Sequence, residues 1–195
     1  MKKVFCFILF VFGLLPFVSQ EADAQVMFVG TKMISLKGGI PYRTNPFHTK
    51  GSFTTGAEYA QFLKGGDYWS VGLDFGQNNV PQKEFFVSDM TFVVNGGYNL
   101  FIIGDFTRTF NLYGFAGLSL GYDLLNKGER ELPDKTPLTK TQAFIYGGKL
   151  GLHSDIYLTT QLAVTLGLGS HFLWGAATKT VVRPYFEGGL KISFY

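Results

Sequence analysis

Apolar and polar residues alternate with a period of two along most of the chain beyond residue 25. In the closing stretch RPYFEGGLKISFY (Arg183–Tyr195), every second residue from Pro184 to Phe194 is apolar or small. The residues between them, which have the opposite parity, include Arg183, Glu187 and Lys191. This period is typical of β-strands, because successive side chains point to opposite faces of a sheet. The pattern predicts eight strands, at Lys32–Pro41, Ser52–Leu63, Tyr68–Phe75, Phe85–Tyr98, Phe110–Tyr122, Ala143–His153, Tyr157–Leu173 and Val182–Phe194.

Long and short connections alternate between these strands. The long ones are Ile40–Gly51, Gly76–Glu84, Asp123–Gln142 and Trp174–Val181. The short ones contain KGGD at Lys64–Asp67, GD within Leu100–Thr109, and SD at Ser154–Asp155, which are residue types that favour tight turns. An up-and-down antiparallel barrel whose first strand starts on the inside would place every long loop at one end. That asymmetry is typical of outer-membrane barrels.

The two parities of the predicted strands also differ in charge. One parity is uncharged, as in the row Leu162, Val164, Leu166 and Leu168. The opposite parity carries four cations and four anions, namely Lys37, Glu58, Asp74, Asp89, Lys149, Arg183, Glu187 and Lys191. A Lys or Arg that faces lipid costs about 2–4 kcal/mol at the membrane midplane, so these charges should face the interior. Barrels of ~8 strands fill their interiors with side chains, so we expect a neutral, paired interior charge network and no open pore.

The N-terminal residues predict export from the cytoplasm. Two lysines precede an apolar run, Val4–Val18, which is shorter than the ~20 residues of a spanning helix. Ala22 and Ala24 then form an Ala-x-Ala site, which is typical of a cleavable signal peptide over residues 1–24. The alternative is an uncleaved N-terminal anchor.

Composition agrees with an all-β chain, since glycine accounts for 25 of 195 residues and aromatic residues for 17%. The prediction is an all-β fold, an eight-stranded antiparallel up-and-down outer-membrane β-barrel formed by residues 25–195 as a single domain. Its expected location is the outer membrane of a Gram-negative bacterium, in contact with outer-membrane lipid. The only cysteine, Cys6, lies in the predicted signal peptide, so no disulfide is expected.

The last strand also suggests how the barrel is assembled. Leu190, Ile192 and Phe194 share the apolar parity, and an outward aromatic residue near the end of the last strand resembles the assembly signal of outer-membrane barrels. Tyr195 follows as one extra residue.

Candidate chemistry is sparse. The histidines, His48, His153 and His171, have no metal-binding spacing, so no metal site or cofactor is expected. Ser154 and Ser170 each neighbour a histidine, but adjacent residues of a strand point to opposite faces. We therefore expect no enzymatic activity. The net charge of +3 with no basic run argues against direct nucleic-acid binding.

The longest predicted loop, Leu124–Lys140, carries many charges and two prolines. It is either a solvated loop or a contact surface for another protein, because loops on a rigid scaffold often carry function.

Four segments carry a resemblance to a known family: LNKGE (Leu125–Glu129), FIYGGKL (Phe144–Leu150), FLWG (Phe172–Gly175) and the closing RPYFEGGLKISF. Their order and spacing resemble the TraO conjugal transfer proteins of Bacteroides-type conjugative elements. The resemblance implies a non-enzymatic structural or interaction component of a conjugative DNA transfer apparatus, whose partners are other conjugal transfer proteins of the envelope complex. It implies no active-site residues, and the oligomeric state is left open. The alternative is a stand-alone outer-membrane barrel, such as an adhesin, a resistance factor or a small-ligand carrier.

Overall fold

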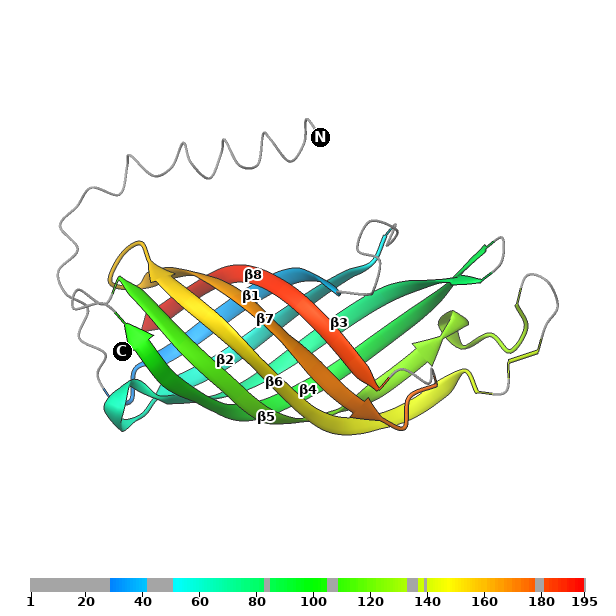
Figure 1. The fold of residues 1–195 in the computed structure, drawn as a ribbon, viewed down its shortest axis with the longest axis horizontal. Coiled ribbons are helices and arrows are strands. Elements are labelled where there is room, and N and C mark those ends of the chain that lie inside the picture. Colours follow the sequence, from blue (N-terminus) through cyan, green and yellow to red (C-terminus); the bar gives the residue numbers. More distant parts are fainter. Residues whose placement is uncertain are drawn as a thin grey trace, which may run out of the picture.

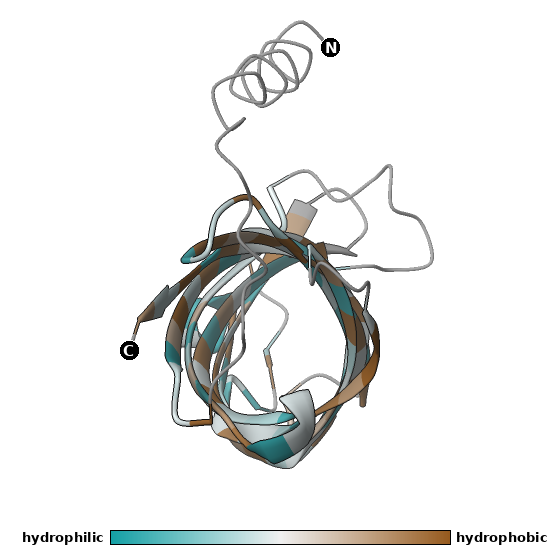
Figure 2. Cartoon of the chain, turned by 90° about the vertical axis from the view of Figure 1, so that its left-hand side faces the viewer, coloured by the Kyte–Doolittle hydropathy of each residue, from teal (hydrophilic) through white to brown (hydrophobic). Residues whose placement is uncertain are grey.

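The computed structural model describes residues 29–41, 51–82, 85–104, 109–132, 137–138, 140–177 and 181–194. Eight antiparallel strands follow one another around a closed barrel, and β1 pairs with both β2 and β8 (Figures 1 and 2). The strands are β1 (Lys32–Pro41), β2 (Phe53–Phe62), β3 (Tyr68–Gln82), β4 (Phe85–Gly104), β5 (Phe110–Leu125), β6 (Gln142–Tyr157), β7 (Leu162–Trp174) and β8 (Val182–Phe194). The predicted all-β, eight-stranded, up-and-down antiparallel barrel is therefore confirmed. The predicted signal peptide and Tyr195 lie outside the described residues.

Two predicted connections are wrong because the strands continue through them. A third, Leu100–Thr109, is shorter than predicted, because β4 extends to Gly104, six residues beyond its predicted end. Beyond Gln77, where pairing with β2 ends, β3 still pairs with β4 as a two-stranded ribbon as far as Gln82. The ribbon occupies most of the predicted loop Gly76–Glu84. Ser154 and Asp155 do not form a turn either, because β6 continues to Tyr157 and pairs with β7 through both of them. The turn lies at residues 158–161, so β7 begins five residues later than predicted.

The connections are sorted between the two ends of the barrel as predicted (Figure 1). One end, here called the turn end, carries the short 3₁₀ turn η3 (Lys64–Gly66) and the turn at residues 158–161. The other, the loop end, carries the β3–β4 ribbon and the β5–β6 connection, residues 126–141, which begins with η4 (Asn126–Gly128). The described part of the chain begins and ends at the turn end.

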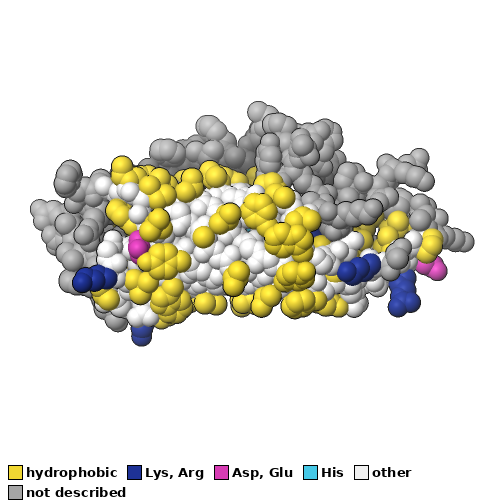
Figure 3. Space-filling view, turned by 60° about the horizontal axis from the view of Figure 1, so that its bottom comes forward, with side chains coloured by type: hydrophobic (Ala, Val, Ile, Leu, Met, Phe, Trp, Pro, Cys, Tyr) yellow, Lys and Arg dark blue, Asp and Glu magenta, His cyan; other side chains and the backbone are white. Residues whose placement is uncertain are grey.

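Side-chain parity separates the two surfaces of the barrel wall. Outward positions are mostly large apolar residues, of which Leu118 is the most exposed at 76%. Aromatic pairs lie toward both ends of this outer surface: Tyr59 and Trp69 near the turn end, and Tyr146 and Trp174 near the loop end. On the face shown in Figure 3, charged side chains lie toward the two ends and the wall between them is apolar or uncharged. This matches a lipid-facing wall bounded by interfacial aromatic residues.

One irregularity breaks the parity. A β-bulge lies in β4 between Phe101 and Ile103, so Ile102 and Ile103 both face outward at the turn end. Phe101 precedes the bulge, keeps the inward parity of Asn99 and packs against Tyr113. Beyond the bulge, Gly104 pairs with the inward Asn111. Among the described residues, no helix is both long and apolar enough to cross a membrane.

Candidate functional site

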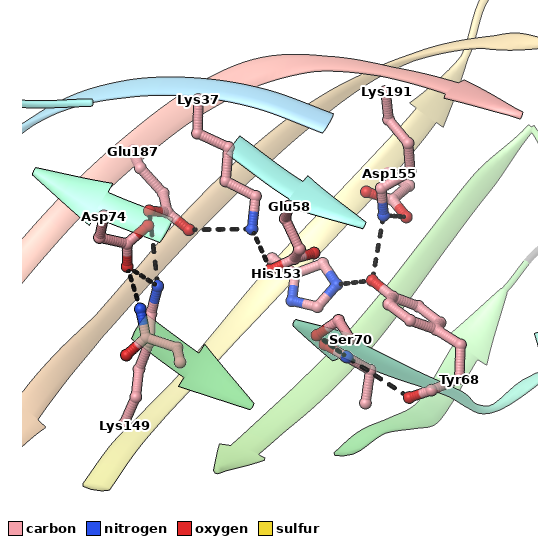
Figure 4. Close-up of polar contacts among 12 residues, drawn as sticks. Lys37, Glu58, Tyr68, Ser70, Asp74, Lys149, His153, Asp155, Glu187 and Lys191 are labelled. Carbon is pink, nitrogen blue, oxygen red and sulfur yellow. Dashed lines mark hydrogen bonds and ion pairs between the residues drawn. The ribbon is translucent and has the colours of Figure 1, made fainter. Parts of the chain in front are cut away.

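The described interior contains three groups of charged and polar side chains, stacked along the barrel. The group nearest the turn end, here called the turn-end cluster, consists of Tyr68, Tyr113, His153, Asp155 and Lys191. The Lys191 ammonium donates hydrogen bonds to Asp155 Oδ2 and, at 3.0 Å, to the Tyr68 hydroxyl, which also contacts His153 Nε2 (Figure 4). The Tyr113 ring stacks on His153 with centroids 5.3 Å apart.

The turn-end cluster is continuous with a buried hydrophobic cluster. Met33, Ala60 and Phe62 pack with Tyr68 and Tyr113, and all five are at most 1% exposed. Lys191 is buried to the same degree. Its ammonium is stabilised there by the Asp155 carboxylate and by the Tyr68 ring, whose centroid lies 4.8 Å away.

The middle cluster contains Lys37, Glu58, Asp74, Lys149 and Glu187. Lys37 lies 2.9 Å from Glu58 and 3.6 Å from Glu187, and Lys149 lies 2.9 Å from Asp74 and 3.9 Å from Glu187 (Figure 4). Glu187 on β8 is therefore shared by cations from β1 and β6. His171 from β7 approaches Asp74 at 3.7 Å. Six strands contribute to this layer, so it ties opposite walls of the barrel together.

The loop-end cluster is centred on Asp123, which is fully buried. Its Oδ1 accepts hydrogen bonds from Arg183, at 3.2 Å, and from the Thr91 hydroxyl, at 3.0 Å. Its Oδ2 accepts the backbone N–H of Ala177 at 3.0 Å. Arg183 also lies 3.9 Å from Asp89. A single guanidinium thus lies beside two buried carboxylates.

All eight charges predicted for the interior lie on the inner surface of the wall, and each has an ion-pair contact. Sequence reasoning missed two further inward carboxylates, Asp123 and Asp155, because it assigned both to connections. The described interior therefore holds four Lys or Arg and six Asp or Glu side chains, so the prediction of formal neutrality is wrong. The signal that could have found them is parity: each lies an even number of residues from an inward residue of the same strand, Ser119 or Lys149.

Two small cavities lie on either side of the middle cluster. The larger, of about 60 Å³, extends toward the loop end and is lined by Arg183, His171 and Leu173, among others. The smaller, of about 10 Å³, extends toward His153. Lys37, Tyr185 and Glu187 line both and so separate them. The larger cavity has room for several water molecules and is far too small for a nucleic-acid strand.

The residues considered for catalysis or metal binding do not form a reactive arrangement. His153 and His171 point into the barrel, whereas Ser154 and Ser170 have the outward parity, and His48 lies outside the described residues. Within the described ranges, no three His, Cys, Asp or Glu side chains are placed to hold a metal ion.

The family model for the conjugative transposon protein TraO matches residues 28–194. The chain belongs to the TraO family. No curated protein matches it.

Two solved structures similar to this TraO-family chain are bacterial outer-membrane barrels. The attachment invasion locus protein Ail of Yersinia pestis, solved with the heparin analogue sucrose octasulfate, is 12% identical with a TM-score of 0.53, covering 86% of this chain and 100% of Ail. The N-terminal β-barrel domain of OprF from Pseudomonas aeruginosa is 13% identical with a TM-score of 0.50, covering 85% and 98%. At these identities the likeness concerns the fold alone, which is that of Gram-negative outer-membrane barrels.

The outward positions of the predicted assembly signal lie on the apolar wall. Leu190 and Ile192 are both more than half exposed, and Phe194 shares their parity. Their placement suits a segment that meets lipid, and their role in assembly stays a prediction.

The β5–β6 connection of this TraO-family chain is partly ordered by its own hydrogen bonds. The Asn126 side-chain amide donates to the carbonyl oxygens of Glu129 and Glu131, and a β-bridge joins Glu131 to Pro137. Lys140, near its end, donates to the carbonyl oxygen of Gly175 in the β7–β8 connection at 2.8 Å. The two connections are therefore in direct contact at the loop end.

Proposed function

We propose that this chain is a non-enzymatic outer-membrane component of a conjugative DNA transfer apparatus, acting through contact with other transfer proteins. It reaches the outer membrane of a Gram-negative donor after cleavage of residues 1–24. Membership of the TraO family supports the link to conjugation. The ion-paired interior, which is largely filled by side chains, supports a role played by the outer surfaces.

A filled interior leaves the outer surfaces of the barrel as the parts that can act. The turn-end cluster closes one end of the barrel, and the middle cluster ties its walls together. An interior filled in this way leaves no room for a DNA strand, which supports a role other than conduction. A role in anchoring or recognition follows more naturally from this arrangement than a role in conduction or catalysis.

The surface best suited to contact is the β5–β6 connection. Lys127, Glu129, Arg130 and Glu131 are exposed there, on a segment held by the Asn126 hydrogen bonds. An ordered segment loses less conformational entropy on binding than a flexible one, which favours its use as a recognition surface. The mixture of both charge signs suits a partner surface that is also mixed in charge.

Gene deletion in a donor strain tests the proposal. Transfer frequency should fall strongly, while growth and nicking of the transferred DNA remain unchanged, and wild-type protein supplied in trans should restore transfer. Normal transfer after complete deletion would rule out the conjugation role and leave a stand-alone barrel.

A second complementation tests the contact surface. A fourfold variant carries serine in place of Lys127, Glu129, Arg130 and Glu131. It removes two charges of each sign, so the net charge is preserved. We expect a normal amount of folded barrel with impaired transfer, whereas Lys64→Ser at the turn end should transfer normally. Normal transfer by the fourfold variant would eliminate this surface but not the family role.

A further inference from the structure

The outer wall formed by β5, β6 and β7 changes character toward the loop end. Exposed leucines cover the middle of this wall. Nearer the loop end, four outward aromatic residues form two directly opposed pairs across neighbouring strands, Tyr122 with Phe144 and Tyr146 with Trp174. Each of the four is at least 41% exposed. Outward aromatic residues above an aliphatic wall mark the level at which hydrocarbon meets the lipid headgroups, so these four are here called the aromatic belt.

Lys140 lies on the loop-end side of the aromatic belt. Its ammonium donates a hydrogen bond of 2.8 Å to the carbonyl oxygen of Gly175, the residue that follows Trp174. Both Lys140 and Gly175 are exposed. On the neighbouring strands, the Tyr122 hydroxyl donates to the side-chain oxygen of Gln142 at 2.9 Å. A fixed positive charge and a polar pair therefore lie directly beyond the belt, where headgroups would lie.

The charge of Lys140 has no carboxylate partner in the described part of the chain. Its ammonium has three N–H donors, and the bond to Gly175 uses only one of them. The other described exposed charges of the β5–β6 connection balance one another, because they are two cations and two anions: Lys127, Arg130, Glu129 and Glu131. Lys140 thus adds a net positive charge and two unused donors at the headgroup level.

We propose that Lys140 and the aromatic belt bind a membrane lipid whose headgroup carries an anionic phosphate. The phosphate oxygens accept the two remaining N–H donors of Lys140 in charge-assisted hydrogen bonds. The acyl chains lie against the belt and the leucines below it. Because the cation stands directly above an apolar wall, the surface fits a lipid rather than free phosphate, which would use the cation alone.

This inference rests on the membrane location included in the proposed function, and it adds a lipid contact for the β5–β6 connection. A lipid bound at Lys140 holds the end of that connection at the membrane surface. The contact can be measured in purified protein, without any transfer assay.

Quenching of Trp174 by brominated lipid measures occupancy of the site. The chain has two tryptophans, so Trp69→Phe leaves Trp174 as the sole fluorescent reporter. The folded barrel in non-ionic detergent is titrated with brominated phosphatidic acid or with brominated diacylglycerol, which lacks the phosphate. We expect phosphatidic acid to quench Trp174 at the lower concentration, and added salt to weaken its effect, because the contact is partly electrostatic.

Three substitutions locate the contact. Lys140→Met keeps the length of the side chain and removes its charge. It should raise the concentration of phosphatidic acid at half-quenching about three- to fivefold, as expected for one charge-assisted hydrogen bond at an exposed site. Lys140→Arg should bind as the parent does, because the charge and donors are kept. Lys64→Met, which removes an exposed charge at the turn end, should have no effect.

A second reporter and a competitor complete the experiment. In Trp174→Phe, Trp69 reports on the turn end, and its quenching should not respond to Lys140→Met. Inorganic phosphate should not displace the brominated lipid.

The proposal is overturned if Lys140→Met, in protein that migrates as a folded barrel, is quenched as readily as its parent. Equal quenching by diacylglycerol would also overturn it, since the lipid would then cover the wall without recognition of phosphate. Displacement by inorganic phosphate would assign the site to a free anion instead. A loss of quenching at Trp69 in Lys140→Met would mean that the whole barrel had changed. Failure of the conjugation role would alter none of these results, so the two failures are distinguishable.

Discussion

The ion pair between Lys191 and Asp155 offers a quantitative test of the interior. The two side chains are 1% and 0% exposed and belong to β8 and β6. Lys191→Met keeps the length of the side chain and removes its charge. It leaves the Asp155 carboxylate buried beside neutral groups, an arrangement that typically costs about 3–5 kcal/mol. The variant also loses the cation–π contact with Tyr68, which is worth up to about 2 kcal/mol when desolvated.

Removing the second charge should recover much of this loss. In Lys191→Met/Asp155→Asn neither charge remains, and a neutral amide needs far less compensation than a carboxylate. We therefore expect the double variant to be more stable than Lys191→Met alone, with a coupling of about 2–3 kcal/mol in the double-mutant cycle. Lys127→Met, at an exposed loop position, is the matched control and should change stability by less than about 1 kcal/mol.

Urea unfolding of the barrel in lipid vesicles provides the assay, followed by the fluorescence of Trp69 and Trp174 and by the band of folded protein on unheated gels. The reasoning would be refuted if Lys191→Met cost less than about 1 kcal/mol. It would also be refuted if the double variant were no more stable than the single one, because the pair would then not be a desolvated unit.

Two further substitution pairs test the wall of the barrel. Leu166→Arg, on the outer surface, should destabilise insertion by about 2–4 kcal/mol. The inward Thr165→Arg should instead cost about 1–3 kcal/mol by overpacking. Only the cost of Leu166→Arg should vary with bilayer thickness. Equal variation for both variants would contradict the inward and outward assignment of β7. Gly147→Ala should destabilise the barrel strongly, because its Cβ would overlap the Phe172 carbonyl oxygen. Gly96→Ala, whose Cβ would make only an ordinary van der Waals contact, should be nearly neutral in the same unfolding assay. Similar losses of stability in both variants would contradict the close approach of the strands at Gly147.

Periodicity was sufficient to predict the number of strands, their inward and outward faces, and the sorting of the connections. The bounds of β1 and β8 were predicted to the residue, because both alternate clearly over their full length. The β3–β4 ribbon was missed because Asn78 and Asn79 are typical of loops, and its pairing depends on a neighbouring strand rather than on local preference.

The interior pairing was less accessible to sequence reasoning. Asp155 beside Ser154 is typical of a turn, and its partner Lys191 lies 36 residues further along the chain. The sharing of Glu187 between Lys37 and Lys149 depends on the registers around the closed barrel, which alternation alone does not specify. The tie between Lys140 and Gly175 joins two connections with no periodic pattern, so no sequence signal could have predicted it.

The central claim is that this TraO-family chain is an outer-membrane barrel that works through its surfaces in conjugation. Its most direct test is to separate the membranes of a transferring donor and follow the protein on gels with and without heating. The account predicts recovery with the outer membrane, resistance to carbonate extraction, and a folded band that shifts on heating. Recovery as a soluble periplasmic protein, with no heat-dependent shift, would contradict it.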